Sequence, residues 1–454
     1  MSITDILLLI AIILAGYIIG VIFLYKKGLF EKYNISFYGP ALLLRTNKGV
    51  NSLRKIANKK RFWKGYGTVG VIFCFLMMIF MIFLLALNTW TVLEFTPEQQ
   101  QELPGIEFGL VIPGLNPILP IEFLVYILIG LIIAVIVHEF SHGILTFAHS
   151  LKVKSLGVLY LIIPLGAFCE PDEDQLRETK ISNRMRVYAA GPMSNFTVAI
   201  IVMIIFSFGF MAAVQPIDGY HIPYVVDQSP ADDIGLQAGD VLQKLNNTEV
   251  ENVSTFLIIM NNTAVNQTIP INYLHKNKNI TTTVTLADKS QFSKNVSDKN
   301  DSFLGIGLNI YNVSKFIGYL QHPFTTDFPD GLILVYALPF FGYIAGYNPL
   351  VAPFTQGYMI QGPLSFLPSN LFWGITNTLY WIFWLNLVVG MFNVLPMIPL
   401  DGGFLFSDAI RGIVKRMKAT ISEEKRENIV RNVTIFISLI ILFIVLFPWF
   451  VKYF

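Results

Sequence analysis

The amino-acid sequence predicts a polytopic α-helical membrane protein, with about six transmembrane helices, into which one extracytoplasmic α+β domain is inserted. Of its 454 residues, 54% are hydrophobic and only 14% are charged, whereas a soluble domain carries about 25% charged residues. A spanning helix needs about 20 apolar residues. Residues 218–312 instead alternate apolar and polar positions between Asn- and Lys-rich turns, which predicts the inserted domain. The six predicted spans are 3–24, 67–89, 121–148, 187–214, 376–399 and 432–451.

The same composition excludes several classes of protein. A net charge of +2 leaves no basic surface of the kind that nucleic-acid binding requires. The two cysteines, Cys74 and Cys169, are too few for a disulfide scaffold or a cysteine-ligated zinc module. The first apolar stretch lacks a basic start and a small-residue cleavage site, so we expect no cleavable signal peptide.

Charges in the loops predict the orientation of the chain. Lys and Arg concentrate on the cytoplasmic side of a membrane, and residues 25–66 contain eleven of them against one acidic residue. This loop is therefore expected inside, together with 150–186 and 411–431. The acidic loop 90–120 fits outside, and so do residues 215–320.

Residues 331–375 do not fit a simple span, because they contain many Gly and Pro residues but no charge. The predicted orientation requires an odd number of crossings between residues 320 and 411, and the span 376–399 supplies one. We therefore expect the segment to cross zero times or twice. Irregular backbone at membrane depth must be buried in protein or line a wet cavity.

The inserted domain carries a local signature. Ser229-Pro230-Ala231 is followed by Gly235-Leu236 and by Gly239-Asp240-Val241. Pro230 suits the first turn of a helix, and the two glycines suit the end of that helix and the turn into a strand. This run resembles a PDZ domain of the permuted kind that accompanies proteases. Another small β-rich domain is the alternative.

Two further features of this domain concern ligands and location. Leu304, Gly305 and Ile306 resemble the loop with which PDZ domains bind a peptide carboxylate, although an ordinary last strand is the alternative. Eight Asn-x-Ser/Thr sequons agree with a location outside the cell. They begin at Asn246, Asn252, Asn261, Asn266, Asn279, Asn295, Asn300 and Asn312.

The chemistry is indicated by His138-Glu139-Phe140-Ser141-His142, which lies within an apolar run. Residues four apart share one face of a helix, so both imidazoles can reach one ion, and Glu139 is close enough to act on water. Ionisable side chains are costly in a membrane helix unless they have a function. A structural role, in which paired polar residues hold helices together, is the alternative.

A catalytic zinc requires a third protein ligand and an open position. His149 comes round to nearly the same helix face as His138, but it lies roughly 16 Å further along a straight helix. Asp401 is the better candidate, because it is the only carboxylate between Asp330 and Asp408. The predicted orientation also brings Asp401 and His142 to a similar depth, nearer the cytoplasm.

Three motifs together resemble the site-2 protease family of intramembrane zinc metalloproteases. They are HExxH, a PDZ-like domain, and the run Asn393-Val394-Leu395-Pro396-Met397-Ile398-Pro399-Leu400-Asp401-Gly402-Gly403. Ala190-Gly191-Pro192-Met193-Ser194-Asn195 is similar to the GPxxN element of that family. Residues 157–167 resemble its membrane-associated β-hairpin, with Ala167 in place of a common glycine.

The resemblance implies a set of functional residues. It implies Zn²⁺ bound by His138, His142 and Asp401, with Glu139 as the general base. It also implies that Asn195 and Asn393 bind the substrate peptide. Expected partners are transmembrane protein substrates and the lipid bilayer, with a peptide C-terminus as a ligand of the PDZ-like domain and no nucleic acid.

The expected reaction is hydrolysis of peptide bonds inside a membrane, with Glu139 moving the proton of the attacking water. A substrate helix hides its carbonyls in its own hydrogen bonds, so it must unwind, and pairing with the edge of the hairpin near 157–168 is expected to hold it extended. Alternatives are a divalent-cation transporter and a non-catalytic membrane binding protein. The absence of repeats argues against the first, and the intact Glu139 argues against the second.

The predicted organisation follows from these assignments, with a multi-pass location in the cell membrane. We expect an N-terminal two-helix region with a basic loop, a protease core in two halves around the PDZ-like domain and an uncharged segment, and a basic C-terminal region. These are residues 1–120, 121–217, 218–312, 313–375, 376–410 and 411–454.

Overall fold

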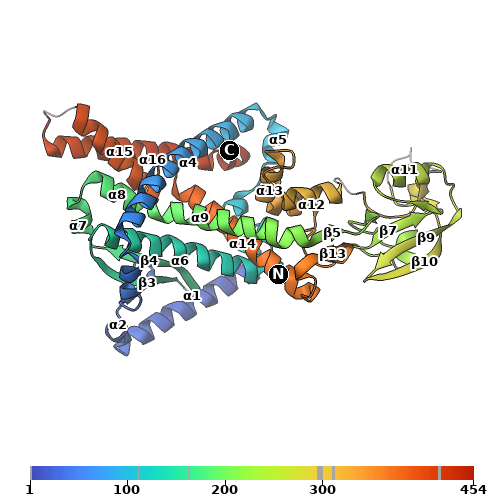
Figure 1. The fold of residues 1–454 in the computed structure, drawn as a ribbon, viewed down its shortest axis with the longest axis horizontal. Coiled ribbons are helices and arrows are strands. Elements are labelled where there is room, and N and C mark those ends of the chain that lie inside the picture. The colour runs from blue at the N-terminus through green and yellow to red at the C-terminus, as the bar shows by residue number, and fades with distance from the viewer. Residues whose placement is uncertain (1–2, 111, 162, 294–299, 309–311, 418–420) are drawn as a thin grey trace. The chain divides into compact units, whose positions relative to one another are not determined.

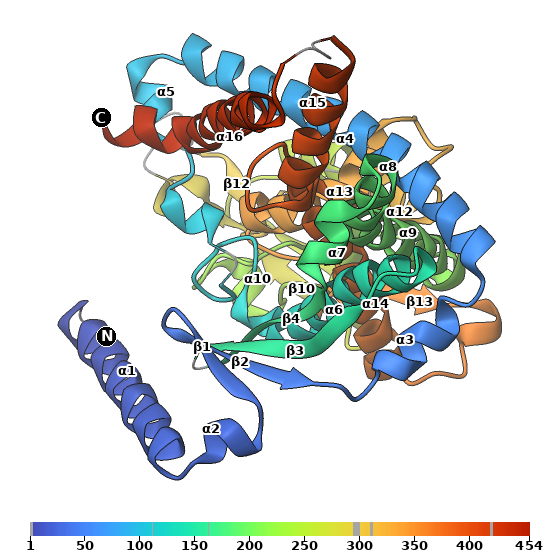
Figure 2. The ribbon, with the colours of Figure 1, turned by 90° about the vertical axis from the view of Figure 1, so that its left-hand side faces the viewer.

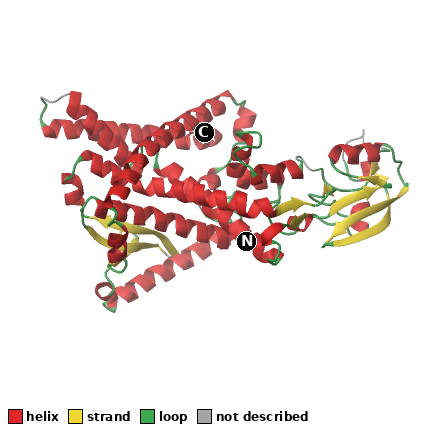
Figure 3. Cartoon of the chain, viewed as in Figure 1, coloured by secondary structure: helices red, strands yellow, loops and turns green. Residues whose placement is uncertain are grey.

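The computed structural model describes residues 3–110, 112–161, 163–293, 300–308, 312–417 and 421–454. The chain, whose helices and strands are labelled in Figure 1, divides into two compact units. The first comprises Met1–Leu110, Ile127–Ile200 and Ile382–Phe454, and the second comprises Val111–Tyr126 and Ile201–Trp381. Figure 3 distinguishes the helices and strands within each unit.

The prediction of a membrane protein is confirmed. Among the described residues, five helices are long and apolar enough to cross a membrane. The first predicted span corresponds to a further helix of 24 residues, α1 (Ile3–Lys26). The five helices are α4 (Lys60–Glu94), the segment Ile121–Ala148 with α6 (Leu124–Ala148), the segment Ala190–Ala213 with α9 (Ala190–Ile204), α14 (Ser369–Asn393) and α16 (Glu423–Tyr453).

The helix predicted at 376–399 begins and ends earlier, because α14 covers Ser369–Asn393. Pro396 and Pro399 follow its end, and a proline disfavours helical backbone in the residue before it. The chain then starts a separate helix, α15 (Asp401–Met417). Asp401 is therefore the first residue of a new helix.

The first unit contains a four-stranded antiparallel sheet in the order β1-β2-β3-β4 (Figure 2). The hairpin implied by the family resemblance is β3 (Val153–Leu161) with β4 (Ile163–Pro171). The basic N-terminal segment adds β1 (Ile35–Tyr38) and β2 (Ala41–Thr46), which the charge pattern of that segment did not predict. Strand β2 pairs along β3, so β3 is covered on both edges.

Short helices complete the first unit, and one of them packs on two longer helices. Helix α8 (Ile181–Tyr188) packs against α4 and α15. A Cβ atom at Gly70 of α4 would lie 3.2 Å from the Met193 side chain, so glycine allows α4 and α9 to approach closely. The remaining short helices are α2 (Leu29–Lys32), α3 (Val50–Ile56), α5 (Pro97–Gln101) and α7 (Glu173–Glu178).

The second unit contains the PDZ-like domain, residues 218–312. Its main sheet has the order β10-β9-β7-β6, with β8 paired to β7. Helix α10 (Pro230–Asp233) begins as expected, with Ser229 as its N-cap and Pro230 in its first turn. The other elements are β6 (Tyr220–His221), β7 (Val241–Leu245), β8 (Thr248–Glu249), α11 (Val253–Asn261), β9 (Thr268–His275), β10 (Lys278–Thr285), β11 (Ala287–Asp288) and β12 (Ser302–Phe303).

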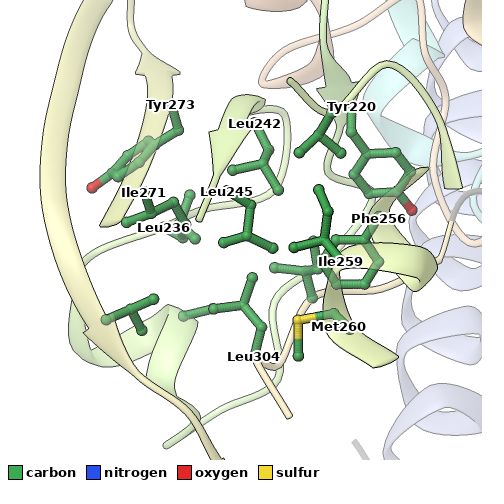
Figure 4. Close-up of a cluster of buried hydrophobic side chains, with 14 of the residues drawn as sticks. Tyr220, Leu236, Leu242, Leu245, Phe256, Ile259, Met260, Ile271, Tyr273 and Leu304 are labelled. Carbon is green, nitrogen blue, oxygen red and sulfur yellow. The ribbon is translucent and has the colours of Figure 1, made fainter. Parts of the chain in front are cut away.

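A single apolar core holds this domain together (Figure 4). Leu242 and Leu245 from β7 meet Phe256 and Ile259 from α11, and Tyr273 from β9 closes one side. On the surface, six of the eight sequon asparagines are exposed and Asn246 is half-buried, whereas Asn295 lies outside the described residues. Alternation along the strands therefore separates this core from a polar surface.

The uncharged segment 331–375 contains a helix of 16 residues, α13 (Asp330–Ala345). Such a helix is shorter than the roughly 20 residues that a span needs. Strand β13 (Tyr358–Ile360) pairs with β5 (Val214–Pro216), next to α12 (Val313–Gln321). Gln356 also donates a hydrogen bond of 3.2 Å to Asp240 of the PDZ-like domain.

Candidate active site

Two histidines of α6 and one aspartate of α15 converge in the first unit. His138 and His142 lie one turn apart, and their ring centroids are 4.9 Å apart. Their Nε2 atoms lie 2.9 and 3.2 Å from the Oδ2 atom of Asp401. The structure therefore brings together the three residues that the sequence predicted as metal ligands, although 259 residues separate two of them in the sequence.

Backbone geometry places Asp401 at this point. Two glycines follow it, and a Cβ atom on Gly402 would collide with the carbonyl oxygens of Val394 and Leu395. A Cβ atom on Gly403 would lie 2.6 Å from the carbonyl carbon of Met397. Only glycine lets α15 start so close to the loop that follows α14.

Hydrogen bonds fix which ring nitrogen of each histidine faces Asp401. The Nδ1 atom of His142 lies 2.7 Å from the carbonyl oxygen of Val187, which can only accept, so Nδ1 carries the proton. The Nδ1 atom of His138 lies 2.7 Å from Oδ1 of Asn195. Nδ2 of Asn195 donates to a backbone carbonyl, so Oδ1 is the atom that faces His138 and accepts the proton of Nδ1. In the neutral rings, both Nε2 atoms therefore present lone pairs.

Three electron-pair donors thus point at one another at close range. The Oδ2 atom of Asp401 is buried without a hydrogen-bond donor, although both Nε2 atoms are within ion-pair distance. A set of two imidazoles and one carboxylate with no proton between them fits a cation, and it is a donor set that zinc prefers. Donation by each Nδ1 to an oxygen is also typical of metal-binding histidines.

Glu139 is half-buried beside the histidines, and its Oε2 atom accepts a hydrogen bond of 2.9 Å from the backbone N–H of Cys169 on β4. That N–H must point away from β3, so the outer edge of β4 faces Glu139. Alternate residues of a strand direct their backbone groups to the same edge. The N–H and C=O of Ala167 therefore face this edge as well.

The two asparagines implied by the resemblance occupy different environments. Asn195 is fully buried, and its polar atoms contact His138, the Ala134 carbonyl and Asn386. Asn393 is half-buried as the last residue of α14, and its amide donates to the Val389 carbonyl of its own helix. Sequence reasoning missed Asn386, whose signal is an amide within the apolar run 379–392 of α14.

Gly191, which belongs to the Ala190–Asn195 motif, has a specific place in the site. A Cβ atom on Gly191 would lie 2.5 Å from Nε2 of His142 and 2.6 Å from Nε2 of His138. The start of α9 therefore lies directly against the two rings. His149, which follows the end of α6, does not belong to the group of converging ligands.

Burial and pairing set the ionisation of two side chains on β4, the strand that contacts Glu139. Burial, with a smaller effect of the Glu139 carboxylate, raises the pKa of the Cys169 thiol to about 12. A hydrogen bond from Ser155 lowers the pKa of Glu170, which also pairs with Arg45 of β2 at 3.1 Å. The N-terminal strand β2 is thus tied to β4 across the sheet.

A charge cluster lies where α8, α15 and α16 meet, and its Arg184 and Asp408 are buried. Arg184 of α8 donates two hydrogen bonds, of 2.8 and 2.6 Å, to the carboxylate of Asp408 on α15. Arg411 bonds to Asp408 as well and pairs with Glu427 of α16. Because the Arg184 pair is bidentate and buried, it fixes the helix that carries Asp401.

The PDZ-like domain places its predicted ligand loop as follows. Leu304 and Ile306 are buried in the core, and Gly305 has a φ of 96°, which favours glycine. The carbonyl oxygens of Leu304 and Gly305 accept hydrogen bonds of 2.8 Å from Ala231 and Val226. The side chains of Leu304 and Ile306 therefore support the loop from inside.

Comparisons with known proteins identify the family of the chain. Residues 126–441 match the model of Peptidase family M50. The chain is 24% identical over 377 residues to an uncharacterized protein of Methanocaldococcus jannaschii, covering 82% of this chain and 78% of that protein. It is 26% identical over 250 residues to the zinc metalloprotease RasP of Bacillus licheniformis, covering 53% of this chain and 54% of RasP.

A solved structure resembles part of the chain. It is the PDZ domain of an SdrC-like protein from Listeria monocytogenes, which is 26% identical in sequence. The match covers 21% of this chain and 90% of that chain, with a TM-score of 0.18.

Proposed function

Because the chain belongs to peptidase family M50, we propose that it hydrolyses peptide bonds within the transmembrane segments of membrane-protein substrates, in regulated intramembrane proteolysis. It is a metalloprotease, and its cofactor is zinc. The observation that carries the proposal is the convergence of His138, His142 and Asp401 within the first unit. These three residues would hold the ion, which supplies a Lewis acid for water and for the scissile carbonyl.

Glu139 acts as the general base in this proposal. Its carboxylate takes the proton from the attacking water and returns it to the leaving amine. The hydrogen bond from the N–H of Cys169 to Oε2 holds the carboxylate beside the histidines. The role is supported by this placement and by the position of Glu139 in the HExxH motif.

The free edge of β4 is the proposed binding place for the unwound substrate. Strand β3 is paired on both sides, so the hairpin offers a peptide only the edge of β4. The backbone groups of Ala167 on that edge lie two residues from Cys169, whose N–H contacts Glu139. A substrate strand paired there keeps its carbonyls away from helical hydrogen bonds and close to the general base.

The proposed topology places the PDZ-like domain outside the cell and the active site within the bilayer, nearer the cytoplasm. It rests on the excess of Lys and Arg in residues 25–66. We expect the Asn300→Cys variant to react with a membrane-impermeant thiol reagent in intact cells, and the Asn58→Cys variant to react only after lysis. Both positions are exposed, and the opposite labelling pattern would overturn the orientation.

The activity is tested with the purified full chain in detergent and a substrate that contains one transmembrane helix. We expect cleavage that a zinc chelator stops and added zinc restores. Glu139→Gln should retain zinc and lose at least 100-fold in cleavage rate, since general acid–base catalysis contributes about 10² to 10⁴. Glu122→Gln, an exposed carboxylate on the same segment, is the matched control.

The outcome also separates the competing functions. Cleavage that falls less than tenfold in Glu139→Gln would contradict the role of this residue. Zinc flux into vesicles that survives Glu139→Gln, without any cleavage by the wild type, would indicate a transporter instead. If the wild type shows neither zinc flux nor cleavage, the remaining alternative is a membrane binding protein.

A further inference from the structure

Two fully buried asparagines lie within the helices that surround the metal ligands. Asn195 is on α9 and Asn386 is on α14. Burying an amide without hydrogen bonds costs several kcal/mol in an apolar environment, so such groups are retained only where partners satisfy them. Both amides are therefore expected to have hydrogen-bond partners within the protein.

The hydrogen bonds form one chain that ends at a metal ligand. Nδ2 of Asn386 donates to the Ile382 carbonyl at 2.7 Å, which directs Oδ1 of Asn386 toward Asn195. Nδ2 of Asn195 donates to that Oδ1 at 3.0 Å and to the Ala134 carbonyl at 2.9 Å. Oδ1 of Asn195 is thereby left to accept from Nδ1 of His138.

The direction of this chain is fixed at both ends. The carbonyls of Ile382 and Ala134 can only accept, so neither amide can flip without losing a hydrogen bond to the backbone. Oδ1 of Asn195 therefore faces His138, whose Nδ1 must donate. The lone pair of Nε2 in His138 then points at Asp401.

We propose that Asn386, acting through Asn195, is a positioning residue that holds His138 in the orientation and tautomer that bind the metal. The inference deepens the proposed function, on which it rests for the identity of the ion. It gives Asn195 a different role from the substrate contact that the family resemblance implies, because all of its polar atoms bond within the protein.

The second histidine provides an internal contrast. His142 is oriented by the backbone carbonyl of Val187, which no side-chain substitution removes. Only the His138 half of the site depends on amide side chains. Loss of the amide chain should therefore weaken zinc binding without abolishing it.

The test measures the affinity of the purified full chain for zinc, without substrate, by competition with a chromogenic chelator. Asn195→Leu should bind zinc about 10 to 100 times more weakly, the usual effect of removing a partner of a metal-binding histidine. Asn386→Leu should weaken binding about three- to tenfold, because Asn195 keeps its bond to Ala134. If Asn195 binds substrate instead, Asn195→Leu would keep wild-type zinc affinity and raise KM, which would overturn the proposal.

Asn377→Leu is the matched control. Asn377 is also a buried amide on α14, and it donates to the carbonyls of Leu350 and Trp373 rather than toward the site. Its substitution should leave zinc affinity within twofold of wild type. Equal losses in Asn377→Leu and Asn386→Leu would mean a general loosening of α14 and would overturn the proposal.

A second variant keeps the test decisive if Asn386→Leu does not fold. Asn386→Asp, buried as the neutral acid, keeps a donor for the Ile382 carbonyl and an oxygen acceptor for Nδ2 of Asn195, so zinc affinity should stay within threefold of wild type. A tenfold loss in Asn386→Asp would contradict the proposed chain of hydrogen bonds. Because the readout is zinc binding, a failure of the proposed proteolysis leaves these outcomes readable.

Discussion

The metal site and the PDZ-like domain are built on opposite principles. In the site, polar side chains from α6, α9 and α14 are buried and hydrogen-bonded to one another, and Asp401 of α15 lies within ion-pair distance of both histidines. In the described part of the domain, 17 buried hydrophobic residues form the core and six sequon asparagines are exposed. The difference teaches that function here depends on a few directional contacts, whereas the domain depends on apolar area.

The largest expected effect is the loss of the third ligand. Asp401→Asn removes the negative charge among the three donors and leaves a poorer ligand. We expect cleavage to fall at least a thousandfold and zinc to be lost, while the PDZ-like domain remains folded. Zinc per chain, measured by metal analysis, checks this.

His149→Ala is the companion control for the ligand assignment. His149 lies outside the converging group, so its substitution should keep full zinc and cleavage. Full zinc in Asp401→Asn together with an empty site in His149→Ala would reverse the assignment of the third ligand.

The converse change, a substitution in the core of the PDZ-like domain, tests whether the metal site is independent of that domain. Leu242 is fully buried in the core of the PDZ-like domain, and Leu242→Ala should destabilise that domain by about 2–5 kcal/mol. Zinc content should not change, because the ligands lie in the other unit. Hydrogen exchange of residues 218–308 measures the effect, and the exposed Leu257→Ala is the control.

A smaller effect is expected where packing and metal chemistry meet. Gly191→Ala places a methyl group against both Nε2 atoms, so α9 must shift or a ring must turn. We expect zinc affinity to fall about tenfold, with little loss of helix content by circular dichroism. Gly412→Ala, whose Cβ would meet open space, should bind zinc normally, and equal losses in both would remove the steric explanation.

The smallest effect on chemistry is expected from removing the whole domain. Deletion of 220–312 should keep zinc, since no ligand is lost. It should change which substrates are cut, by a few-fold in relative rate, if the domain selects substrates by size or by a free C-terminus. Unchanged rates on both full-length and pre-trimmed substrates would exclude that role.

Local pattern was enough to predict the elements that local pattern controls. The spacing of His138 and His142 and the start of α10 at Pro230 both follow from residues within a few positions of one another. Asp401 was predictable because it stands alone in an apolar run. The fold class was therefore accessible from the sequence at the level of a helical membrane protein with a PDZ-like insertion.

Contacts between segments that are distant in the sequence could not be predicted from the sequence. No periodicity relates Asn386 to Asn195, which lies 191 residues earlier, and a glycine motif does not reveal that Gly191 faces two rings. The charges of the N-terminal segment predicted its location, but they did not reveal that residues 35–46 form the strands β1 and β2. These features depend on which helices and strands are neighbours, which a single sequence does not specify.

The pairing of β2 with β3 has a consequence for biosynthesis. It joins Leu42 to Tyr160, so the N-terminal strands wait for their partner while more than a hundred further residues leave the ribosome. During that interval the β1–β2 hairpin has an unpaired edge, which is prone to pair with another chain. The translation of residues 153–161 is therefore the step that covers this edge of β2.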